Sequence, residues 1–158
     1  GLLDLKGKVF AYSDPYSNAG YLSPRYELKK QGIDADRFFR RTFFTRSHRK
    51  SIEAVAVGVA DAAPVNSYIW ETLDQQSPAL TGRTRVAARS EEYGFPPFVA
   101  YHTVPASERL ALRQVLLEMA DDPDGRAVLK NLNLDGFMPP RADIYQPVRE
   151  MISFMEAK

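Results

Sequence analysis

The sequence predicts an α/β fold, in which a mostly parallel sheet flanked by helices is followed by a C-terminal helical segment. Over the first part of the chain, short apolar runs alternate with stretches of helix length, as expected for parallel strands joined by crossover helices. After the Pro96-Pro97 pair the sequence turns mainly helical. The proline pair therefore marks a boundary or hinge, and we expect two regions, 4–95 and 96–158.

Local signals predict each element of the first region. Gly32 and Gly58 follow the first two helical stretches as stop signals, and Ser47 is placed to cap the second of them. We expect strands at 8–12, 42–45, 59–65 and 84–90, helices at 20–30, 49–57 and 66–74, and a loop at 77–82.

The second region is predicted to begin with one more strand and to continue as helices. Ser107 is placed to cap the first helix, and Asp122 opens the second. We expect the strand at 98–101 and the helices at 108–120, 123–132 and 143–155.

Composition excludes several classes of function. The 158 residues are 44% hydrophobic and 26% charged, which is typical of a globular protein. A net charge of +1 provides no field that would attract nucleic acid or a membrane surface. The absence of cysteine excludes disulfides, thiolate catalysis and zinc–sulfur sites. No apolar stretch approaches the roughly 20 residues of a membrane-spanning helix.

The first residues contain no signal peptide and no initiator Met, so we expect the chain to begin inside a longer protein.

The loop after the first strand is the leading candidate site. It joins a strand to a helix through small polar residues, 13–20, and backbone N–H groups at a helix start lack intrahelical partners. With the helix dipole and the Ser17 hydroxyl, these groups form a seat for a small oxyanion. An ordinary capped turn would have the same sequence, so both interpretations stay open.

A second anion donor is predicted at the next strand–helix junction. His48 lies at the expected helix start beside the Ser47 hydroxyl, where it can donate to an anion or simply face solvent. Carboxyl ends of parallel strands meet at one edge of a sheet. We therefore expect the segments 13–20, 45–48, 66–68 and 90–93 to converge.

The remaining polar clusters are better explained without function. Asn66 is explained by helix capping, the basic run 46–50 by a solvated face and the Glu91-Glu92 pair by a surface loop. His102 has no polar constellation near it in sequence and is predicted to be structural. The chain has no nucleophile elbow, P-loop or His-Glu-x-x-His motif. These observations favour binding without catalysis, and they call for no cofactor and no metal.

Eight segments resemble, in order, the phosphate/phosphite/phosphonate-binding proteins of bacterial ABC transporters, a type 2 periplasmic binding protein family. Residues 14–21 resemble the loop Asp-Pro-x-Ser-x-Ser-Gly-Tyr, and residues 44–48 resemble Phe-Thr-Gly-Ser-His. Residues 61–68 resemble Asp-Ala-Gly-Ala-Val-Asp-Ser-Tyr. The other matching segments are 4–9, 96–100, 122–126, 134–137 and 143–149. The similarity covers nearly all of residues 4–150.

The resemblance implies a set of ligand-binding residues: Ser17, Asn18 and Ala19 in the oxyanion seat, His48 as a second donor to the same oxyanion with Ser47 beside it, and Tyr68. Tyr68 falls where some phosphonate binders place a carboxylate for a substrate amine. A phenol does not neutralise an ammonium, so phosphate, phosphite or a simple alkylphosphonate is expected rather than an aminophosphonate. Ala19 replaces the usual second Ser, and Asn66 replaces the commoner Asp.

The resemblance also implies a role and a location. Residues 4–95 would be one ligand-binding lobe, and 96–158 a crossover strand with helices that pack on a first lobe missing from this chain. The protein would capture its anion for an ABC transporter permease, in the periplasm or anchored to the membrane outside the cytoplasm. Side chains such as Leu110 and Val115, with Leu116 and Met119, would then be open to packing or self-association. Two alternatives stay open: the sensing domain of a membrane receptor, and an enzyme on the same fold similar to a thiamine-precursor synthase.

Overall fold

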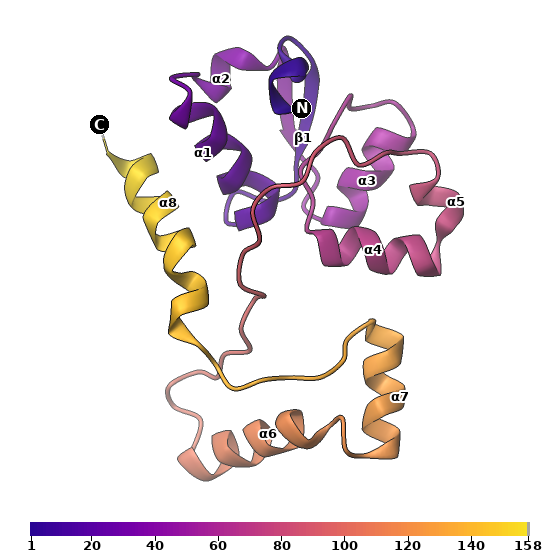
Figure 1. Ribbon diagram of the computed structural model, residues 1–158, viewed down its shortest axis with the longest axis vertical. Coiled ribbons are helices and arrows are strands. Elements are labelled where there is room, and N and C mark those ends of the chain that lie inside the picture. Colours follow the sequence, from indigo (N-terminus) through magenta and orange to yellow (C-terminus); the bar gives the residue numbers. More distant parts are fainter. Residues whose placement is uncertain (158) are drawn as a thin grey trace. The chain divides into compact units, whose positions relative to one another are not determined.

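The computed structural model describes residues 1–157, and it divides the chain into two compact units (Figure 1). One unit comprises residues 1–92 together with the C-terminal residues from 146 onward, and the other comprises residues 93–145. The first contains η1 (Leu2–Leu5), β1 (Val9–Tyr12), η2 (Asn18–Leu22), α1 (Ser23–Lys30), α2 (Ala35–Phe38), β2 (Arg41–Phe44), α3 (His48–Ala56), α4 (Ser67–Gln76), α5 (Pro78–Thr81) and α8 (Gln146–Glu156). The second contains α6 (Ala106–Glu118), α7 (Pro123–Leu132) and η3 (Ala142–Tyr145).

A small parallel sheet lies at the centre of the first unit. Strands β1 and β2 pair in parallel, with Val9 opposite Arg41 and Tyr12 opposite Phe44. On the other side of β1, Ala62 forms a parallel bridge to Phe10. The strand expected at 59–65 is thus reduced to a single bridge, while the predicted α/β class with parallel pairing is confirmed.

Strand β1 is buried on both faces, which explains its unbroken apolar sequence. On one face Phe10 stacks on Phe39 with ring centroids 4.2 Å apart, and Leu28 of α1 is fully buried beside them. On the other face Val9 and Ala11 pack with Ala60 and with residues of α3. Burying a large apolar side chain contributes about 1.5–3 kcal/mol, so this strand anchors the unit.

Two predicted strands are wrong. Residues 84–90 and 98–101 have no regular structure, and most of their side chains are exposed, with Phe98 at 74% and Val99 at 86%. A strand needs a neighbour for its backbone hydrogen bonds, and within residues 1–157 neither segment enters a ladder. An apolar, β-branched sequence alone does not supply that neighbour.

The predicted helices lie close to their expected positions, but α2 and α5 were not predicted, residues 143–145 lie in η3 rather than in the last helix, and the cap of α6 differs. The expected loop 77–82 contains α5, because Pro78 occupies the first helical turn, where a proline is favoured. Helix α6 begins at Ala106 after Pro105, so Ser107 lies inside the helix and is not its cap. Asp122 caps α7 as expected, accepting a hydrogen bond from the Gly125 N–H at 2.7 Å.

The last helix, α8, packs against α1 in the first unit. The Lys29 ammonium donates hydrogen bonds to the carbonyl oxygens of Phe154, Met155 and Ala157, at 3.0, 3.0 and 2.7 Å. Met151 is buried in the same unit. A cation that satisfies carbonyl groups at a helix C-terminus stabilises that end.

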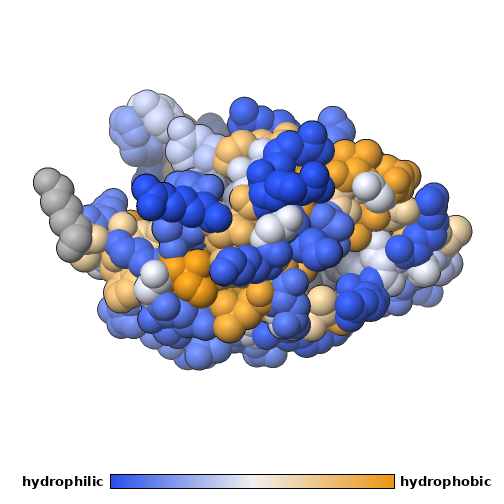
Figure 2. Space-filling model, turned by 90° about the horizontal axis from the view of Figure 1, so that it is seen from above, coloured by the Kyte–Doolittle hydropathy of each residue, from blue (hydrophilic) through white to orange (hydrophobic). Residues whose placement is uncertain are grey.

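Apolar side chains on the face shown in Figure 2 occupy separate patches between hydrophilic ones. Within the described residues, no helix combines the length and the apolar character needed to cross a lipid bilayer.

Candidate anion-binding site

Three loops meet at the carboxyl edge of the sheet, as predicted. The loop after β2 is hydrogen-bonded to the end of β1, because the Thr45 N–H donates to the Tyr12 carbonyl at 2.9 Å and the Arg46 N–H to that of Ser13 at 2.8 Å. The Asn66 N–H donates to Nδ1 of His48 at 3.3 Å, which ties the loop before α4 to the start of α3. The fourth expected loop, 90–93, follows no strand, so the reason for placing it at this edge fails.

The first of these loops ends in a helix start with available donors. Ser17 caps η2, and its Oγ accepts a hydrogen bond from the Gly20 N–H at 3.0 Å. The first backbone bond of this helix runs from the Leu22 N–H to the Ser17 carbonyl. The N–H groups of Asn18 and Ala19 therefore have no acceptor among the described residues. They are the donors on which the predicted oxyanion seat depends.

Ser13 is a polar residue of this edge that sequence reasoning did not single out. Its side chain is 1% exposed, and within residues 1–157 its Oγ has no hydrogen-bond partner. Burying a hydroxyl without a partner is unfavourable, so such groups are rare away from sites that bind something. The feature of the sequence that could have singled out Ser13 is its position directly after the buried strand β1.

Gly20 allows the loop to close tightly around this hydroxyl. A Cβ on Gly20 would lie 1.6 Å from Oγ of Ser13 and 2.9 Å from Oγ of Ser17. Only glycine fits at this distance. The requirement is steric, and it explains why the loop carries glycine here.

The second helix start, at α3, differs from expectation in its cap. Ser47 has the extended backbone of an N-cap residue, but its hydroxyl makes no capping hydrogen bond. Thr45 organises the turn instead, because its Oγ1 lies 2.7 Å from Oγ of Ser51 and donates to the Ser47 carbonyl at 2.9 Å. The Ser47 hydroxyl and the N–H of His48 consequently have no acceptor in the described part of the chain.

The structure determines which nitrogen of His48 can donate. Nδ1 accepts the Asn66 N–H, so a neutral ring carries its proton on Nε2. Partial burial lowers the pKa of His48, which favours this neutral form near pH 7. Nε2–H is therefore a hydrogen-bond donor that requires no positive charge on the ring.

Tyr68 lies in the first turn of α4, the third helix that starts at this edge. Its N–H donates to Oδ1 of Asn66 at 2.9 Å, so Asn66 caps the helix as predicted. The side chain of Tyr68 is half-buried. All six predicted residues thus lie on loops or first turns at the carboxyl edge: Ser17, Asn18, Ala19, Ser47, His48 and Tyr68.

Arg46 is a second residue of this edge outside the predicted site, because the sequence explained the basic run 46–50 as a solvated face. It has a φ of +65°, a left-handed conformation that a side chain bearing a Cβ adopts at a cost. Its guanidinium lies 3.8 Å from the Asp14 carboxylate and 5.7 Å from the centre of the Phe44 ring. The feature of the sequence that could have singled out Arg46 is its position, because the motif Phe-Thr-Gly-Ser-His, which residues 44–48 resemble, has glycine there.

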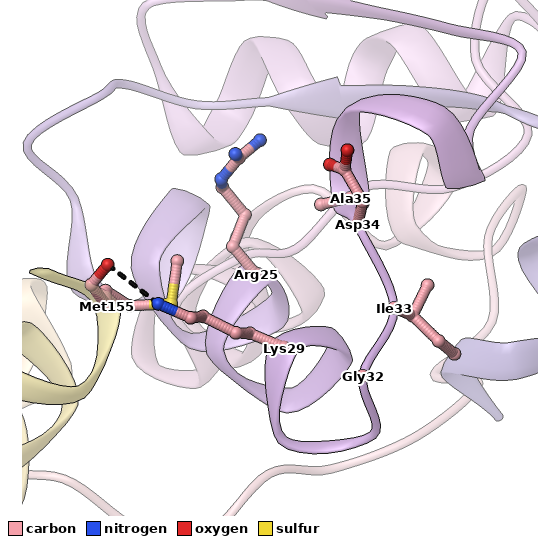
Figure 3. Close-up of a pocket in the computed structure, with 7 residues that line it drawn as sticks. All are labelled: Arg25, Lys29, Gly32, Ile33, Asp34, Ala35 and Met155. Carbon is pink, nitrogen blue, oxygen red and sulfur yellow. Dashed lines mark hydrogen bonds between the residues drawn. The ribbon is translucent and has the colours of Figure 1, made fainter. Parts of the chain in front are cut away.

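A cavity of the first unit lies away from this edge (Figure 3). It has a volume of about 450 Å³ and lies at the C-terminal end of α1, toward the amino ends of the parallel strands. Lys29, one of its cations, already contacts three carbonyl groups. The cavity is lined by Arg25, Lys29, Gly32, Ile33, Asp34, Ala35 and Met155.

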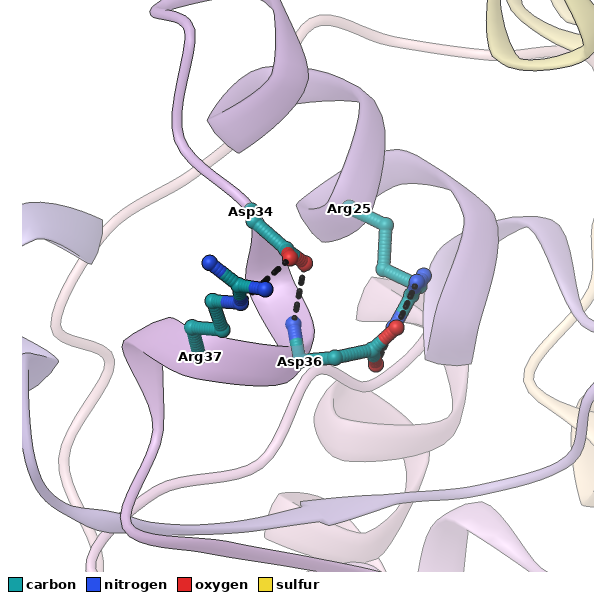
Figure 4. A network of polar contacts seen from close by, with 4 residues as sticks. All are labelled: Arg25, Asp34, Asp36 and Arg37. Carbon is teal, nitrogen blue, oxygen red and sulfur yellow. Dashed lines mark hydrogen bonds and ion pairs between the residues drawn. The ribbon is translucent and has the colours of Figure 1, made fainter.

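The other cation of this cavity is paired as well (Figure 4). Arg25 donates to both carboxylate oxygens of Asp36, at 2.6 and 3.0 Å, and this pairing lowers the pKa of Asp36. Asp34 caps α2 and lies 3.5 Å from the Arg37 side chain. Because these charged groups already pair with one another, the cavity leaves few donors available to bind an anion.

Comparison with known proteins identifies the family. The family model described as "ABC transporter, phosphonate, periplasmic substrate-binding protein" matches residues 1–145. The probable ABC transporter phosphite binding protein PhnD1 of Prochlorococcus marinus (strain MIT 9301) is 25% identical over an alignment of 162 residues, covering 96% of this chain and 53% of that protein.

Solved structures share the fold. The structure of Prochlorococcus marinus PhnD1 in complex with methylphosphonate superimposes with a TM-score of 0.80 at 21% identity, covering 98% of this chain and 59% of that one. The binding protein component of an ABC phosphonate transporter from Pseudomonas aeruginosa also gives 0.80, at 25% identity, covering 97% and 51%. The chain spans about half the length of the curated relative that it matches. With the family model covering most of its residues, the chain belongs to the family of periplasmic substrate-binding proteins of phosphonate ABC transporters.

Proposed function

We propose that this chain forms a lobe that captures a small phosphorus oxyanion, namely phosphate, phosphite or a simple phosphonate, for ABC-type import without catalysis. The observation that carries the proposal is the pair of helix starts at η2 and α3. They follow adjacent parallel strands, they are linked by backbone hydrogen bonds, and their first N–H groups have no acceptor among the described residues. The names of the relatives support the same class of ligand.

Each proposed contact uses a donor that the fold leaves available. The N–H groups of Asn18 and Ala19 and the Ser17 hydroxyl would bind one side of the anion, since Ser17 Oγ accepts from Gly20 and keeps its own proton to donate. Nε2–H of His48 and the Ser47 hydroxyl would bind another side of the anion. Hydrogen bonds to a charged group contribute about 1.5–3 kcal/mol each, so a few of them suffice for tight capture.

Tyr68 narrows the proposed ligand class. This half-buried residue lies in the first turn of α4, the helix capped by Asn66, whose own N–H donates to His48. A neutral phenol gives no ion pair to an ammonium group. An aminophosphonate would therefore bind more weakly than phosphate, phosphite or methylphosphonate.

We infer that residues 4–95 supply one wall of the binding site and that a second lobe supplies the other. The chain covers about half of its curated relative, whose remaining length is enough for such a lobe. In α6, Leu110 is 65% and Val115 62% exposed, which supports a partner surface for this helix. That partner would be the second lobe or, failing it, a second copy of the chain. The whole protein would deliver its ligand to a permease outside the cytoplasm.

Calorimetric titration tests the function. The complete gene product is titrated with phosphate, phosphite and methylphosphonate, and at least one is expected to bind with one site per chain. His48→Gln is expected to weaken binding about tenfold or more through the loss of one charge-assisted hydrogen bond. The control is His102→Gln, which alters the other, exposed histidine in the second unit and should leave affinity unchanged.

Two outcomes would contradict the proposal. One is the absence of heat with all three anions. The other is equal affinity in the His48→Gln and His102→Gln proteins, because the predicted contact would then not exist. A sensing module would use the same capture step, so the titration tests anion capture equally for a transporter component and for a receptor domain.

A further inference from the structure

Arg46 has an unusual backbone at the centre of the candidate site. Its φ of +65° is in the left-handed region, where a residue with a side chain is destabilised relative to glycine. It lies between β2 and α3, two residues before His48. Residues held in this conformation cluster at functional sites, where the surrounding structure maintains them.

The side chain of Arg46 extends from one loop of the site toward another. Its guanidinium lies 5.7 Å from the centre of the Phe44 ring, and its NH1 lies 3.8 Å from Oδ2 of Asp14. That distance is too long for a hydrogen bond. Asp14 itself belongs to the loop that leads to Ser17, and its Oδ1 accepts the Tyr16 N–H at 2.9 Å. The arginine therefore brings a positive charge beside the loop that leads to Ser17.

The donors of this guanidinium are not used within the protein. Among the described residues, it makes no hydrogen bond, and the side chain is 69% exposed. Arg49, three residues later, differs: its Nε donates to Oε1 of Glu53 at 3.0 Å, one turn along α3. Both arginines have a carboxylate partner, but only Arg49 is hydrogen-bonded to it, whereas Arg46 lies 3.8 Å from Asp14.

We propose that Arg46 is a specificity-determining residue of this site, whose guanidinium favours phosphorus anions with two negative charges over anions with one. The inference rests on the proposed function and deepens it. An added positive charge attracts a ligand in proportion to the charge that the ligand carries. The helix starts and His48 donate hydrogen bonds to any oxyanion, whereas Arg46 adds the part of the attraction that depends on net charge.

An isosteric pair of ligands separates charge from shape. Methylphosphonate and methanesulfonate have the same tetrahedral outline, and at about pH 8.5 the first carries two negative charges while the second carries one. Arg46→Gln is expected to weaken methylphosphonate binding about tenfold and methanesulfonate binding only about threefold, because the electrostatic free energy scales with ligand charge. The matched control, Arg49→Gln, removes the same charge one turn away and should change neither affinity by more than about twofold.

A second comparison excludes an indirect effect through Asp14. If Arg46 acted only by neutralising that carboxylate, Arg46→Gln would have no effect in a protein that already carries Asp14→Asn. We expect the same tenfold loss for methylphosphonate in that background. Absence of the loss there would overturn the inference.

Arg46→Gly distinguishes binding from folding. Glycine relieves the left-handed backbone, so the melting temperature should rise while methylphosphonate binding weakens. If Arg46 only stabilised the fold, Arg46→Gly would lower both the melting temperature and the affinity for methylphosphonate. If the unaltered protein binds the anions and Arg46→Gln matches Arg49→Gln, the inference fails and the proposed function stands. If the unaltered protein binds none of the phosphorus anions, the proposed function fails and the inference fails with it.

Discussion

The two edges of the parallel sheet differ in how they use their polar groups. At the carboxyl edge, N–H groups of Asn18, Ala19 and His48 have no acceptor among the described residues, and the buried Ser13 hydroxyl has no partner there either. The cations that line the cavity are already paired, Arg25 with Asp36 through two hydrogen bonds and Lys29 with three carbonyl groups. The cavity lies at the amino edge, and the available donors lie at the other.

The difference arises from the direction of parallel strands. Each strand ends at the carboxyl edge, and the helix after it begins there, so the positive ends of η2, α3 and α4 gather at one edge. The C-terminal end of α1 lies at the opposite edge, with its carbonyl groups and Lys29. Available donors therefore favour the carboxyl edge as the candidate anion site, although the described cavity lies at the other edge.

A pair of glycines tests this comparison with the largest expected effect. Gly20→Ala at the carboxyl edge would place Cβ 1.6 Å from Oγ of Ser13, and overpacking of this kind costs about 3 kcal/mol. Gly32→Ala at the amino edge meets no atom within 4 Å and suffers only from its φ of +71°, at about 1 kcal/mol. Urea unfolding measures both, and phosphate titration should show a loss for Gly20→Ala alone. Equal destabilisation by the two would contradict the described packing.

Replacing the first of two adjacent lysines at the amino edge is expected to change stability by an intermediate amount. Lys29→Met keeps the aliphatic stem but removes the donor to three carbonyl groups at the end of α8, and should cost about 1–2 kcal/mol. Hydrogen exchange should show α8 opening more readily, with anion binding unchanged. The control is Lys30→Met, whose exposed ammonium pairs with Glu27 at 3.4 Å and lies over the Tyr26 ring, contacts that solvent weakens, so stability should change much less than for Lys29→Met. If α8 is equally protected from exchange in the two variants, Lys29 does not hold it.

The pH dependence of stability that His48 causes is the smallest of the expected effects. Burial lowers its pKa in the folded protein below the ordinary value of 6.5, so the unfolded chain binds more protons between these two values. Its contribution to stability is therefore complete above about pH 6.5 and is lost as the pH falls toward the folded pKa. Thermal melts from pH 5 to pH 8 should show a shallower slope for His48→Gln than for His102→Gln. Identical slopes would contradict a neutral, partly buried His48.

Much of the candidate site was predictable because its signals are local. Ser17, Ser47 and His48 come after strands in the sequence, and parallel pairing alone brings such positions together. Ser13 was not singled out, and Arg46 was assigned to a solvated basic run, for different reasons. The burial of a hydroxyl depends on what covers it, and a left-handed φ at a residue other than glycine is imposed by neighbouring hydrogen bonds.

The sequence by itself determined the order of the helices, their glycine stops and the Asn66 and Asp122 caps, because these signals act over a few residues. Only the tertiary structure decided that 84–90 and 98–101 are not strands, since a strand depends on a neighbour distant in the sequence. It also decided that α8 packs on α1, and that Nδ1 of His48 is occupied by a backbone N–H. Those outcomes depend on long-range contacts, which local patterns do not encode.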